Sequence, residues 1–157
     1  MKTDILKKYI LPGLVITFFG FILLNLTFIF DAAFQSLTRW IIQFFTSNDS
    51  YQSLGWFPPF NHIAFAILIG LISWLVFKSK LKDIYKAIYL TVPTAVVLVT
   101  FGIMFWQTPV WTYMLGGLSV LGTLYYFYLK KLPWIYYYAV ILVGFTLTIG
   151  GIFEMEI

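Results

Sequence analysis

The sequence contains no cysteine and few charged residues, and these shortages exclude several kinds of protein. Without cysteine the chain forms no disulfide, no thiolate nucleophile and no cysteine-ligated metal or cluster. Only 10% of its 157 residues are charged, against roughly a quarter in an average soluble domain. A single histidine with scattered carboxylates supplies a zinc site poorly, since such a site needs several ligands held together. We therefore expect no metal and no other cofactor.

Signatures of common enzymes and of nucleic-acid binding are also missing. There is no GxSxG, HExxH, P-loop or dinucleotide fingerprint. No carboxylate stands in the middle of a long apolar run, as ion-coupled transporters and proton relays require, so we do not expect transport by this chain alone. The net charge of +4 comes from lysines beside apolar runs, which indicates orientation in a membrane and not a nucleic-acid footprint.

Hydrophobic and aromatic side chains are abundant instead, at 61% and 22% of the residues. They form long runs at residues 9–30, 62–77, 87–106, 110–127 and 134–153. A run of about 20 residues crosses about 30 Å of hydrocarbon as a helix. We therefore predict an all-α integral membrane protein with a single domain over residues 1–157, built as a compact bundle of five transmembrane helices. The first run is longer than the apolar region of a signal peptide, so we expect it to be retained.

Residues 32–46 have a different pattern from the long runs. Their apolar side chains recur at helical spacing while polar ones occupy another face, as in an amphipathic helix. The apolar set is Phe34, Leu37, Ile41, Phe44 and Phe45, and the polar set is Gln35, Arg39 and Gln43. We predict that this segment is a separate interfacial helix in the first outer loop. Pro58 and Pro59 are expected to prevent any helix before Phe60.

The lysines indicate how the chain is oriented. They cluster before residue 9, between the second and third runs, and between the fourth and fifth runs. With five crossings, all of these clusters lie on one side of the membrane, and the positive-inside rule makes that side cytoplasmic. We therefore predict a cytoplasmic N-terminus and an extracytoplasmic C-terminus.

Small residues repeat at helical spacing on the first, fourth and fifth runs, where they allow helices to approach closely in lipid. The sets are Gly13, Thr17 and Gly20; Gly116, Ser119 and Thr123; and Gly144, Thr148 and Gly151. They serve either contacts within the bundle or homo-oligomer contacts between copies of the chain, and the sequence leaves both open. Asn25 is expected to form a hydrogen bond between helices, and Pro93 to kink the third span.

With this topology, most polar side chains other than lysine gather at the extracytoplasmic rim. The candidate ligand-binding residues there are Asp31, Arg39, Trp56, Asn61, His62, Gln107, Trp111 and Tyr113. His62, Asp31 and Glu154 are the candidate acid–base set if the protein is an enzyme. The structural alternatives are a local hydrogen bond for His62, an ion pair between Asp31 and Arg39, and interfacial anchoring for the tryptophans.

The order of segments also resembles, in part, the tryptophan-rich sensory or translocator proteins. The resemblance lies in the number of spans, the many aromatic residues and Trp56-Phe57-Pro58-Pro59 just before the second span. It implies a binder of porphyrins or other apolar ligands. The Asn and Trp pattern of that family in the third span and its Pro-Tyr pattern in the fifth are absent here, so no functional residue is transferred.

Three hypotheses about function follow. The favoured one is a non-catalytic membrane protein, either an accessory subunit of a larger complex or a binder of a lipid or apolar small molecule in a pocket open to the extracytoplasmic side. The second is an enzyme that acts on a lipid-linked substrate at the outer leaflet. The third is a transporter component that depends on a partner. Membrane lipid is a partner in each case, and the small-residue faces suit a protein partner or a second copy of the chain.

Overall fold

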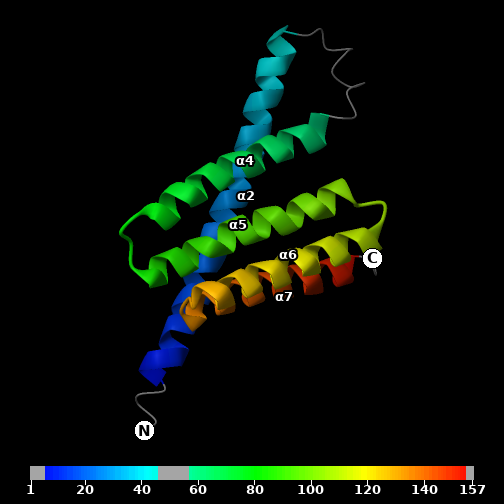
Figure 1. Cartoon of the computed structure of the whole chain (residues 1–157). Helices are drawn as coiled ribbons and strands as arrows, with labels where there is room; N and C mark the ends of the chain where they lie inside the picture. Colours follow the sequence, from blue (N-terminus) through cyan, green and yellow to red (C-terminus); the bar gives the residue numbers. More distant parts are fainter. Residues whose placement is uncertain (1–5, 46–56, 155–157) are drawn as a thin grey trace.

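Apart from short turns, the chain is helical throughout the residues that the structure, a computed structural model, describes, which are 6–45 and 57–154 (Figure 1). Its elements are a π-helical turn η1 (Leu6–Ile10), which continues into α2 (Leu11–Phe45), then α4 (Phe57–Lys78), α5 (Asp83–Met104), α6 (Pro109–Lys130) and α7 (Trp134–Glu154). No strand occurs in either described range. The prediction of an all-α protein is confirmed.

Within residues 6–45 and 57–154, four helical segments are long and apolar enough to cross a membrane: Leu6–Phe44, Phe60–Lys78, Asp83–Met104 and Trp134–Gly151. This combination of length and composition indicates a membrane protein. α6 has 22 residues, as α5 has, but its tyrosines, glycines and hydroxyl side chains make it less apolar. The predicted span over 110–127 therefore lies in a helix of sufficient length whose hydropathy is lower than that of the others.

α2 is one uninterrupted helix of 35 residues. The separate amphipathic helix predicted over 32–46 is therefore wrong as a distinct element, because those residues form the C-terminal part of α2. No proline or glycine follows Gly20 in α2, and Gln35 Nε2 donates to Asp31 Oδ2 at 2.9 Å, so nothing interrupts the helix at Asp31. At about 1.5 Å per residue, α2 is about 50 Å long, which exceeds the usual hydrocarbon thickness of about 30 Å.

The second predicted span also begins earlier than expected. α4 starts at Phe57, so Pro58 and Pro59 lie in its first turn, and the prediction that they prevent a helix before Phe60 is wrong. The N–H groups of a first helical turn have no acceptor within the helix, so a proline there removes no hydrogen bond. The early start places Asn61 and His62 inside α4, where both are buried.

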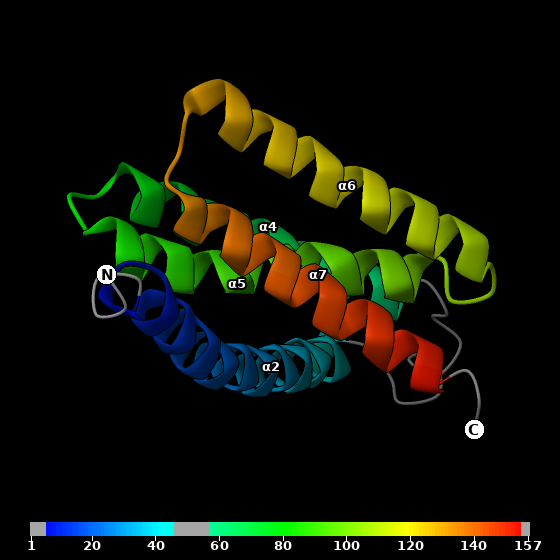
Figure 2. The same ribbon diagram turned by 90° about the horizontal axis from the view of Figure 1, so that it is seen from below.

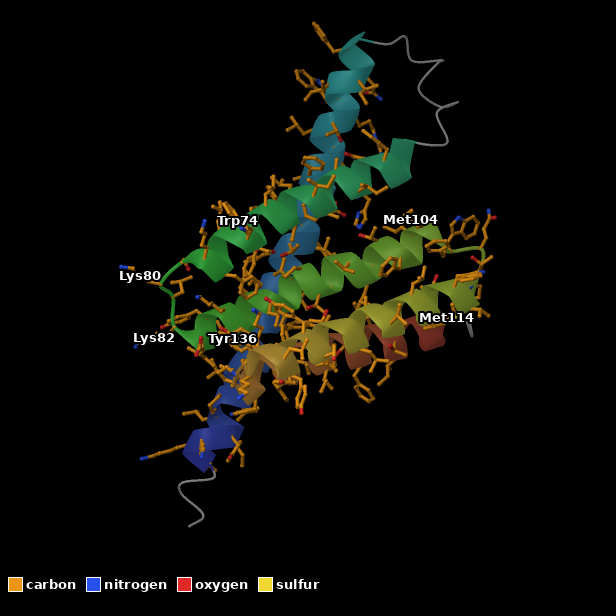
Figure 3. The ribbon with its side chains drawn as sticks, viewed as in Figure 1. Trp74, Lys80, Lys82, Met104, Met114 and Tyr136 are labelled. Carbon is orange, nitrogen blue, oxygen red and sulfur yellow. The ribbon has the colours of Figure 1, made fainter. Side chains whose placement is uncertain are left out.

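α5 lies at the centre of the bundle and packs against α2, α4, α6 and α7. Figure 1 shows α4, α5, α6 and α7 running alternately in opposite directions, while α2 crosses them obliquely. In the view from below, α2 lies on one side of the bundle and α6 on the other (Figure 2). The α4–α5 turn with Lys80 and Lys82 lies at one end of the bundle, and Met104 and Met114 lie at the opposite end (Figure 3).

The small-residue face of α2 is used within the chain. Ile16 on this face has 0% of its surface exposed, and the hydroxyl oxygens of Thr17 and Tyr138 lie 2.8 Å apart between α2 and α7. A Cβ atom at Gly20 would lie 3.0 Å from Thr91 Cγ2 on α5, so glycine allows this close approach. Of the two uses that the sequence left open, contact within the bundle accounts for this face.

The sequence also made predictions for Asn25 and Pro93. Asn25 Nδ2 donates to the carbonyl of Phe21 on its own helix at 2.7 Å, and the Asn25 side chain is exposed. The predicted hydrogen bond from Asn25 to another helix is therefore wrong, because a carbonyl one turn away already serves as acceptor. Pro93 lies inside α5, which continues on both sides of it from Asp83 to Met104.

We predict that Gly20→Ala and Gly13→Ala differ in stability although each adds one methyl group to the same face of α2. The methyl group at position 20 meets fully buried Thr91 and should lower the free energy of unfolding by about 1–3 kcal/mol. At position 13 it would lie 3.7 Å from the Tyr138 ring, an ordinary van der Waals distance, and should cost little. Thermal unfolding in one detergent measures both variants. Equal stability would contradict the close contact of α2 with α5.

Candidate functional site

Asp31 on α2 and His62 on α4 form a buried pair. His62 Nδ1 lies 3.5 Å from Asp31 Oδ2, and the His62 and Asp31 side chains are 5% and 13% exposed. The same carboxylate oxygen accepts the hydrogen bond from Gln35, so Asp31 is also held from its own helix. The sequence predicted both residues at one rim, and the structure brings them into direct proximity.

Arg39 is not the partner of Asp31, and the ion pair suggested for these two residues is wrong. Arg39 is exposed on a later turn of α2, and their spacing in sequence separates the two Cα atoms by about 12 Å along the helix axis. The carboxylate instead faces Gln35 and His62.

An aromatic cluster lies beside His62, whose ring centroid is 6.2 Å from that of Phe65. The Phe65 ring is 1% exposed, and its centroid lies 5.8 Å from that of Phe30 and 5.7 Å from that of Phe34. Among the described residues, Asp31 Oδ1 and both ring nitrogens of His62 are buried without a hydrogen-bond partner. Because even a neutral imidazole carries an N–H group, at least one buried donor lacks an acceptor, at a cost of about 1–3 kcal/mol. The pair thus places two ionisable side chains, with buried atoms that lack a hydrogen-bond partner in the described residues, between α2 and α4.

A large cavity lies between α6 and α7, with one side chain contributed by α5. Its volume is about 530 Å³, within the range of about 300–1,000 Å³ that is usual for small-molecule sites. Its lining residues are Leu98, Thr112, Tyr113, Gly116, Gly117, Val120, Leu121, Ile141, Gly144, Phe145, Leu147 and Thr148. Hydroxyl groups are the only polar side-chain groups in this lining. We refer to it below as the α6/α7 cavity.

Glycines of α6 and α7 allow close contacts with neighbouring helices and also leave open space. A Cβ atom at Gly144 would lie 3.5 Å from Val120, and one at Gly116 would lie 3.3 Å from Leu98. A Cβ atom at Gly117 would meet nothing within 4 Å, although this residue lines the cavity. The sequence identified Gly116 and Gly144 as packing residues but did not predict the cavity. A glycine in a helix can allow either a close helix contact or an empty space, and the sequence does not tell which.

The candidate ligand-binding residues fall into separate places. Tyr113 lines the α6/α7 cavity, while Asn61 is buried beside His62. Gln107 and Trp111 are exposed near the α5–α6 turn.

The remaining candidates do not complete a single rim pocket. Trp56 lies outside the described residues, and so does the side chain of Glu154. Neither Asp31 nor His62 lines the α6/α7 cavity, or a cavity between α4, α5 and α6, or one between α2 and α5. The buried pair and the cavities are therefore distinct features.

The chain matches no protein-family model, no curated protein and no solved structure. Within residues 6–45 and 57–154, no three histidine, aspartate or glutamate side chains gather closely enough to hold a metal ion. The function must therefore be inferred from the geometry and chemistry of the pair and the cavities.

We predict that Asp31 and His62 are energetically coupled. In a double-mutant cycle with Asp31→Asn and His62→Gln, unfolding in detergent should give a coupling free energy of about 0.5–3 kcal/mol, as is usual for residues in contact. Asn25→Ala is the matched control, because this exposed side chain bonds only its own helix. It should change stability little and show no coupling to His62→Gln. Additive effects of Asp31→Asn and His62→Gln would rule out the interaction.

Proposed function

We propose that the protein is an integral membrane protein that binds an apolar small molecule or lipid acyl chain in the α6/α7 cavity. The observation that carries this proposal is a half-open cavity of about 530 Å³ with a largely apolar lining. In a membrane such a lining favours a ligand by close packing and not by removal of apolar surface from water. No carboxylate, imidazole or ammonium group lines the cavity, which favours binding without catalysis.

The cavity has few polar groups, and two of its hydroxyls already donate hydrogen bonds to backbone carbonyls. Thr148 Oγ1 donates to the carbonyl of Gly144 at 2.7 Å, and Thr112 Oγ1 donates to the carbonyl of Phe105 at 3.1 Å. Their protons are therefore not free to select a strongly polar ligand. A mainly apolar ligand fits this lining better than the head group of a lipid-linked substrate does.

The proposal includes five crossings, with the N-terminus in the cytoplasm and the C-terminus outside. α6 equals α5 in length and packs against both α5 and α7, which also contact each other. Like any helix, α6 satisfies its own backbone hydrogen bonds, so it can cross a membrane. The α4–α5 and α6–α7 turns, both rich in lysine, lie at the same end of the bundle (Figure 1). The positive-inside rule assigns that end to the cytoplasm, and the α6/α7 cavity then lies toward the outer leaflet.

We predict that Gly117→Leu blocks the cavity while Gly122→Leu does not. Both glycines are exposed positions of α6 with space for a Cβ atom, but only Gly117 lines the cavity. The probe is palmitic acid carrying a diazirine, photoactivated with the protein in phosphatidylcholine vesicles. In the wild type and in Gly122→Leu, labelling should map to residues 112–121 and 141–148 and be displaced by excess palmitic acid. Gly117→Leu should lose most of this displaceable labelling.

Competition separates a defined site from the general lipid surface, because labelling by bulk lipid does not saturate. The proposal fails if palmitic acid displaces no label from these segments in the wild type. It also fails if Gly117→Leu and Gly122→Leu behave alike.

We predict that single cysteines placed at the two ends of the bundle are accessible to reagent from opposite sides of the membrane. The chain contains no native cysteine that would have to be removed first. Lys80 and Gln107 are both exposed in turns, the first between α4 and α5 and the second between α5 and α6. A membrane-impermeant maleimide added to intact cells should label Gln107→Cys and spare Lys80→Cys until the membrane is permeabilised. Labelling of both from the same side would contradict the proposed topology.

A further inference from the structure

A second cavity, of about 210 Å³, lies over α5 between α4 and α6. Figure 1 shows α5 between these two helices, and α4 and α6 do not pack on one another in the described residues. The cavity is therefore a recess open to the surrounding lipid between α4 and α6. Its polar lining consists of hydroxyl side chains, namely Ser73, Thr94, Ser119 and Thr123. We refer to it as the hydroxyl cavity.

Each of these hydroxyl groups donates its proton to a carbonyl of its own helix. Thr94 donates to Leu90 at 2.8 Å, and Ser73 donates to Ile69 at 2.7 Å. Ser119 donates to Gly116 at 2.8 Å, and Thr123 donates to Ser119, also at 2.8 Å. A hydroxyl has a single proton but two lone pairs, so what these groups can still offer is acceptor capacity.

Neighbouring groups add to this excess of hydrogen-bond acceptors over donors. Tyr89 Oη lies 3.3 Å from Ser73 Oγ, and because the Ser73 proton is already used, the tyrosine is the donor in this contact. Pro93, which lines the cavity, has no N–H group, so the carbonyl of Tyr89 loses its usual donor. The remaining lining is apolar, and no charged side chain belongs to it. A molecule seated here finds hydrogen-bond acceptors and no free donor.

We propose that the hydroxyl cavity binds the hydroxyl-bearing head of a membrane alcohol or phenol, with the hydrocarbon part extending into lipid between α4 and α6. An O–H donor satisfies acceptors that hydrocarbon cannot satisfy, whereas an ether, ester or ketone of the same shape brings only further acceptors. The volume accommodates a head group and not a whole lipid. This site shares only Val120 with the α6/α7 cavity, so it does not depend on the function proposed above.

The test compares an alcohol with its methyl ether. A diazirine-bearing octanol is photoactivated with the full-length protein in phosphatidylcholine vesicles, and labelled peptides are mapped by mass spectrometry. Unlabelled octanol should displace the label from residues 90–97 and 119–123 at a concentration about tenfold lower than octyl methyl ether does, since one hydrogen bond in an apolar setting is worth about this factor. Equal potency of alcohol and ether, or no displaceable label in these segments, overturns the proposal.

Matched threonine variants test whether the preference for the alcohol over its methyl ether arises in the hydroxyl cavity. Thr94→Val together with Thr123→Val removes two acceptors and should make octanol and its methyl ether equally potent. Thr100→Val together with Thr146→Val is the control, because these hydroxyls bond Val96 and Leu142 of their own helices and do not line the cavity. Ser119→Ala provides a milder variant if the double variant does not fold. An unchanged preference in folded Thr94→Val/Thr123→Val, or in Ser119→Ala where that variant replaces it, overturns the assignment.

Discussion

The structure depends on one constraint, which is that hydrocarbon offers no partner for a backbone or side-chain polar group. The chain meets it by local hydrogen bonding. Hydroxyl groups on α2, α5, α6 and α7 donate to carbonyls three or four residues earlier, as Thr27, Thr100, Thr123 and Thr146 do. Asn25 behaves in the same way on the exposed side of α2. Polar residues therefore mark lipid contact or helix packing in this chain more often than they mark a site.

Some polar groups do not bond within their own helix, and they lie at the two ends of the bundle. At the lysine-rich end, Tyr136 donates to Asp83 at 3.0 Å and Lys86 donates to the carbonyl of Phe77 at 3.0 Å, so hydrogen bonds between elements hold α4, α5 and α7 together there. Toward the other end, Asp31 and His62 are buried with atoms that have no hydrogen-bond partner in the described residues. The lysine-rich end is thus held by hydrogen bonds between helices, while the Asp31–His62 pair toward the other end keeps polar atoms without a partner.

Sequence reasoning succeeded where the physical signal is local. Helix positions follow from the apolar runs, so the helices near 87–106, 110–127 and 134–153 were predicted within a few residues. It failed at residues 32–46, where an amphipathic pattern suggested a separate helix but no residue breaks α2. It also failed at Pro58 and Pro59, which a first turn tolerates. The proximity of Asp31 to His62 depends on how α2 crosses α4. The α6/α7 cavity depends on which neighbour faces each of its glycines. Neither relation is encoded by spacing along one helix.

The position of the α6/α7 cavity follows from the connection between its two helices. The chain reverses at Lys131, whose left-handed backbone has φ 52°, and this joins α6 and α7 closely at the lysine-rich end. Away from the turn no covalent link holds them together, and small residues decide their separation. Gly151 admits the Tyr113 hydroxyl, since a Cβ atom there would lie 3.0 Å from it. The tyrosine thus bridges the two helices near their unjoined ends, and the α6/α7 cavity lies between this contact and the turn.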